Sequence, residues 1–65
     1  MTPIDVYNEV RRVLNGSATA VFLDVSDAGD KNRVVGIAHY WANKSGVGIK
    51  TKWQKNCGFV EIRAL

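Results

Sequence analysis

The first fourteen residues carry apolar side chains at the spacing of an amphipathic helix. Apolar or aromatic residues recur every three or four positions, which places them along one face of a helix. These positions are Ile4, Tyr7, Val10, Val13 and Leu14. The pattern therefore predicts a helix whose apolar face covers another element.

Residues that favour helix ends flank this pattern. Thr2 can cap the N-terminus, Pro3 suits the first helical position, and Asp5 completes a capping-box pattern with Thr2. Asn15-Gly16 supplies a left-handed stop. We therefore predict a helix from about Pro3 to Leu14.

The rest of the chain alternates between apolar runs and short polar turns. The runs are rich in β-branched and aromatic residues and cover 18–26, 33–41, 47–54 and 59–65. The turns between them cover 27–32, 43–46 and 55–58. Short turns favour antiparallel neighbours, and a sheet needs one face covered. We predict a single α+β domain over residues 1–65, with the N-terminal helix packed on a four-stranded antiparallel β-meander.

Alternation along the strands assigns side chains to two faces. The face that meets the helix is expected to carry Val21, Leu23, Ile49, Val60 and Ile62. The opposite face is expected to carry Phe22, Lys50, Lys52, Phe59 and Arg63. The second run is ambiguous, because either Tyr40 or the pair His39 and Trp41 would join that opposite face.

Charge is distributed unevenly along the chain. The formal net charge is +3, but residues 1–30 carry −3 and residues 31–65 carry +6. No acidic residue occurs from Lys31 to Val60. This asymmetry indicates a polyanion or an acidic protein surface as partner, although the two halves could instead pair with each other.

The inventory of reactive side chains is small. The chain has one histidine, His39, and one cysteine, Cys57, with no evident orienting partner for either. Asp24, Asp27 and Asp30 lack the alternate spacing and distant glutamate of a calcium loop. We therefore expect a protein that is not an enzyme and that uses no metal or cofactor.

A basic and aromatic stretch carries the strongest functional signal. Cations neutralise phosphates, and aromatic rings stack on unpaired bases. The candidate binding residues are Arg33, Tyr40, Trp41, Lys44, Lys50, Lys52, Trp53, Lys55 and Arg63. The alternative is structural, because lysines deter edge pairing and tryptophans anchor small cores. The sequence favours a small basic binding module that contacts nucleic acid through a sheet face and a 44–55 hairpin.

The same features fit a second class of partner. A short basic chain without a catalytic set could be a phage- or mobile-element-type regulator or inhibitor that binds an acidic surface on a larger host protein. The meander would leave its first and fourth strands as free edges, which favours a possible homodimer. A single cysteine and the lack of a long apolar run favour a cytoplasmic protein without membrane contact.

Overall fold

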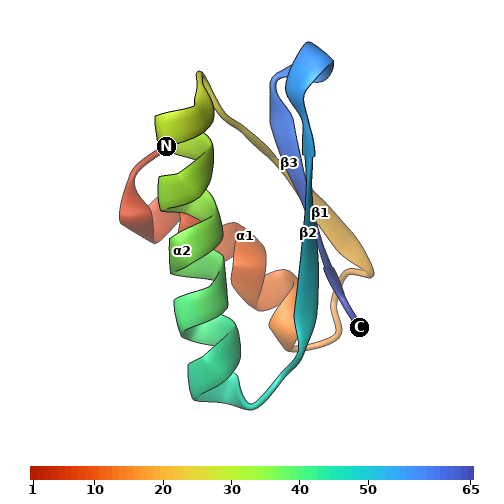
Figure 1. Ribbon diagram of the computed structural model, residues 1–65. Coiled ribbons are helices and arrows are strands. Elements are labelled where there is room, and N and C mark those ends of the chain that lie inside the picture. The colour runs from red at the N-terminus through yellow and green to blue at the C-terminus, as the bar shows by residue number, and fades with distance from the viewer.

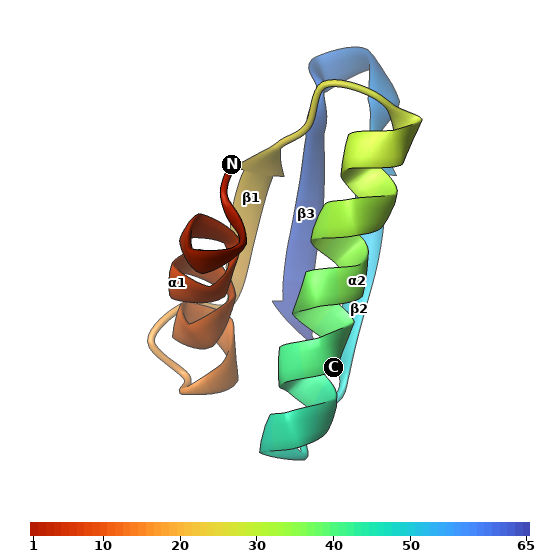
Figure 2. The same cartoon turned by 90° about the vertical axis from the view of Figure 1, so that its left-hand side faces the viewer.

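Two helices pack on one face of a three-stranded antiparallel sheet (Figures 1 and 2). The computed structural model describes residues 1–65. The elements are α1 (Pro3–Leu14), β1 (Ala20–Asp24), α2 (Ala28–Ser45), β2 (Ile49–Gln54), the 3₁₀ turn η1 (Lys55–Cys57) and β3 (Phe59–Ala64). Neither helix is both long enough and apolar enough to cross a lipid bilayer.

Helix α1 has the bounds that its end signals predict. The Thr2 hydroxyl accepts a hydrogen bond from the Asp5 N–H at 3.2 Å, and the Asp5 carboxylate accepts one from the Thr2 N–H at 3.1 Å. The core-facing stripe is Val6, Val10 and Val13. The prediction for Ile4 is wrong, since its side chain is 66% exposed. At about 100° per residue, Ile4 lies about 160° from Val6 and about 180° from Val13, so it points away from the buried stripe.

Helix α2 replaces the predicted second strand, so the four-stranded meander is wrong. Residues 33–41 lie inside this helix, and residues 28–32, predicted as a turn, form its beginning. The Asp27 side chain caps the helix by accepting a hydrogen bond from the Asp30 N–H at 2.8 Å. The helix ends at Gly46, whose φ of 68° is left-handed.

Packing explains why this segment is helical despite its β-branched and aromatic residues. Val34, Ala38 and Ala42 are fully buried, and their spacing of four residues places them on one face of the helix. The small alanines let α2 lie close to its neighbours. This tertiary contact outweighs the weak strand preference of the local sequence.

Strand β3 lies in the centre of the sheet, between β1 and β2. The meander prediction placed this last strand at an edge, which is wrong. Helix α2 connects β1 to β2 across one face of the sheet, so these two strands are not neighbours. Strand β3 lies between them and pairs with both (Figure 2). The free edges therefore belong to β1 and β2. The face beneath the helices carries Val21, Leu23, Ile49, Val60 and Ile62, as predicted from alternation.

Candidate functional site: the open sheet face

The face of the sheet that points away from both helices is uncovered (Figure 1). We call it the open sheet face. Strand register arranges its side chains in three rows across β1, β3 and β2. The rows are Ala20–Arg63–Lys50, Phe22–Glu61–Lys52 and Asp24–Phe59–Gln54. Five of these positions were assigned to this face by sequence alternation, namely Phe22, Lys50, Lys52, Phe59 and Arg63.

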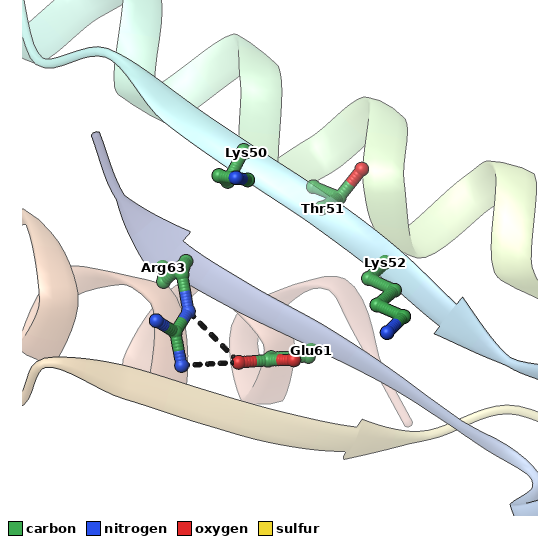
Figure 3. A pocket seen from close by; sticks show the side chains of 5 residues that line it. All are labelled: Lys50, Thr51, Lys52, Glu61 and Arg63. Carbon is green, nitrogen blue, oxygen red and sulfur yellow. Dashed lines mark hydrogen bonds and ion pairs between the residues drawn. The ribbon is translucent and has the colours of Figure 1, made fainter.

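One ion pair lies in the middle of this face. Arg63 donates from Nε and Nη2 to one oxygen of Glu61, at 2.8 and 2.6 Å (Figure 3). Lys52 is directly opposite Glu61 in the register but makes no ion pair with it. Glu61 therefore pairs with Arg63 on its own strand, and the ammonium group of Lys52 forms no ion pair.

A polar hollow of about 210 Å³ lies over β2 and β3. Its lining is entirely polar and includes three cations, of which Lys50 and Arg63 are directly opposite each other. Like charges at directly opposite positions destabilise a strand pair. Glu61 also lines the hollow and compensates Arg63, so the uncompensated charges there are those of Lys50 and Lys52. The hollow therefore suits an anionic group better than an apolar ligand.

Two phenylalanines form the aromatic part of the open sheet face. The rings of Phe22 on β1 and Phe59 on β3 meet edge to face, with centroids 5.4 Å apart and planes at 88°. Phe22 is 59% exposed. This arrangement places an accessible aromatic surface beside the cations.

Most cations of the chain already have a role within the fold. Arg12, Arg33 and Arg63 form ion pairs. Arg11 and Lys44 lie in the last turns of α1 and α2, where positive charge complements the helix dipole. Lys31 and Lys55 lie over the Trp53 ring at 5.2 and 5.8 Å. The two cations left without such a role are Lys50 and Lys52.

The remaining candidate residues do not join the open sheet face. Tyr40, Trp41 and Lys44 lie on α2, which covers the other face of the sheet. Arg33 is also on α2, and Lys55 flanks Trp53 at the end of β2. The predicted 44–55 hairpin is wrong, because this range joins the end of α2 to β2. The real hairpin is β2–η1–β3.

A second hollow, of about 470 Å³, lies between the C-terminal halves of the two helices. Trp41 packs there against Tyr7 with ring centroids 4.5 Å apart, and Arg11 and Lys44 lie beside them. Sequence reasoning missed Tyr7 and Arg11 because it placed Trp41 on a strand. The four-residue spacing of Val34, Ala38 and Ala42 fits a helix, but this spacing alone does not separate a helix from a strand here.

The reactive side chains do not gather into a centre. His39 is exposed on α2, and Cys57 is exposed in η1. No three of the histidine, cysteine, aspartate and glutamate side chains come close enough to hold a metal ion. Asp27 and Asp30 instead act at the start of α2, where Asp30 accepts a hydrogen bond from the Ser26 N–H at 3.0 Å.

Comparisons with protein-family models, curated proteins and solved structures found no match for this chain.

Proposed function

We propose that the protein is a non-catalytic module that binds nucleic acid through its open sheet face. One observation carries the proposal. Lys50 and Lys52, the two cations without a role in the fold, lie on the same uncovered face as an exposed aromatic pair. Cations neutralise phosphates and release counterions, while aromatic faces stack on bases.

The distribution of charge favours the β2 side of this face for the phosphates. Arg63 neutralises Glu61 in the middle of the sheet, and the free ammonium groups lie on β2. The Arg63 side chain is 51% exposed and uses only Nε and Nη2 on Glu61, so its remaining N–H donors can contact a phosphate while the ion pair stays in place. Lysines on an edge strand also deter edge-to-edge pairing, so the test must separate that role from binding.

The test is fluorescence anisotropy of a labelled oligonucleotide at a series of salt concentrations. Lys50→Ala and Lys52→Ala should each weaken binding and lower the salt slope by about 0.7–0.9, because each removes about one phosphate contact. The loss should not depend on base sequence, since phosphates carry none.

Lys44→Ala is the matched control, because it removes the same charge from α2 on the other side of the sheet. It should leave the salt slope unchanged. An equal loss from Lys44→Ala would show that net charge alone drives binding. Salt-independent binding, or no binding in dilute salt, would reject the proposal and favour an acidic protein surface as the partner.

A further inference from the structure

We propose that the open sheet face selects single-stranded over double-stranded nucleic acid by stacking one base on Phe22. This inference rests on the proposed function. It adds the substrate class and a division of labour within the site: Phe22 takes a base, and Lys50 and Lys52 take the backbone.

The layout of the middle row supports this division. Phe22, Glu61 and Lys52 follow one another across β1, β3 and β2. The carboxylate of Glu61 is paired with Arg63, so the centre of the face carries no net charge, whereas Lys50 and Lys52 on β2 are uncompensated and direct the backbone toward β2. A base is uncharged, and it can lie over the β1 side beside that carboxylate. The face therefore has one side for phosphates and another for a base.

The geometry of the phenylalanine pair limits the aromatic side to one base. The rings of Phe22 and Phe59 are perpendicular, at 88°. Consecutive bases in a stacked strand are parallel, so two perpendicular rings cannot both stack on them. Phe22 offers the larger free surface, because it is 59% exposed and Phe59 is half-buried.

Stacking on a sheet face requires a base that is already unpaired. In a duplex the base faces are covered by their neighbours, and extruding one base costs a few kcal/mol. The phosphates, in contrast, are accessible in both forms. Lys50 and Lys52 therefore give affinity for either form, and Phe22 gives the preference for a single strand.

The experiment compares a labelled single strand with its duplex at one low salt concentration. Wild-type protein should bind the single strand more tightly. Phe22→Ala should weaken binding of the single strand roughly 5- to 150-fold and leave duplex binding nearly unchanged. Phe22→Tyr should keep the preference because it keeps the ring. Phe22→Leu should lose it, because an aliphatic side chain has no aromatic face. Circular dichroism of each variant confirms folding.

Tyr40→Ala is the matched control, since it removes a 53% exposed aromatic side chain from α2 instead. It should change neither affinity. Equal binding of single strand and duplex, or full affinity in Phe22→Leu, would overturn the inference. The proposed function would survive that result if Lys50→Ala still lowered the salt slope. No binding of either form would overturn both.

Discussion

Replacing Gly36 by alanine is expected to stabilise the protein measurably, and the effect tests whether residues 33–41 are helical. Gly36 lies in the middle of α2 and is exposed, and an added Cβ would meet no atom within 4 Å. No packing is therefore gained or lost, and only the intrinsic preference changes. Alanine is favoured over glycine by about 0.8–1.0 kcal/mol in a helix interior. In a domain of this size, 1 kcal/mol raises Tm by about 4–8 °C.

Gly36→Val makes the test specific for a helix. Valine loses side-chain freedom in a helix but suits a strand, so alanine should stabilise more than valine if α2 is correct. Urea denaturation followed by circular dichroism gives both free energies of unfolding, with an unchanged m-value expected. Gly46→Ala is the contrasting variant, because φ at Gly46 is 68° and alanine there should destabilise by about 1–2 kcal/mol. A higher stability of Gly36→Val than of Gly36→Ala would refute the helix.

Three further predictions concern the core, the loss of stability at low pH and the oligomeric state. Leu23→Ala should cost about 2–5 kcal/mol, because Leu23 is fully buried; a cooperative unfolding transition of unchanged midpoint would contradict the core. The Ser26 N–H and then Arg33 lower the pKa of Asp30, so this carboxylate stabilises the fold above about pH 4 and the gain is lost as pH falls through the folded pKa. Asp30→Asn should thus be less stable than wild type near neutral pH and equal to it in acid by urea denaturation, whereas a pH-independent difference would contradict the linkage. A homodimer is expected through the free edge of β1, because Lys50 and Lys52 disfavour pairing at β2; sedimentation velocity showing a monomer at all concentrations would exclude it.

Local signals in the sequence were sufficient for α1 and for the faces of the strands. The helix bounds follow from Thr2, Pro3 and Asp5, which act on their own neighbours in the chain. Alternation placed Lys50 and Lys52 opposite Ile49 because that pattern is set within one strand. The burial of Val6 in place of Ile4 depends on the rotation of α1 about its own axis against the sheet. The apolar pattern of the helix does not determine this rotation.

Two features of the fold depend on long-range packing: the helical state of residues 33–41 and the central position of β3. Apolar and aromatic residues in the range 33–41 follow neither a strict alternation nor a single helical stripe. The spacing of apolar residues therefore does not by itself separate a strand from a buried helix. The start of α2 repeats the spacing of the first capping box, with Asp27 and Asp30 in the places of Thr2 and Asp5. The polar residues around Asp27, together with Gly29, also fit a turn. Once α2 is taken as a strand, the central position of β3 cannot be found.

The exchange of a strand for a helix also changes how strongly the open sheet face can hold a polyanion. Residues 31–65 carry seven lysines and arginines. If all of them contacted the phosphates of a single strand, the salt slope would be about 5. The structure leaves only Lys50, Lys52 and Arg63 on the open sheet face, and these give a slope of about 2. A slope near 2 requires that stacking on Phe22, or several copies on one strand, supply much of the affinity at physiological salt. A slope near 5 would mean that the helical side also contacts the backbone, and that the strand wraps around the sheet.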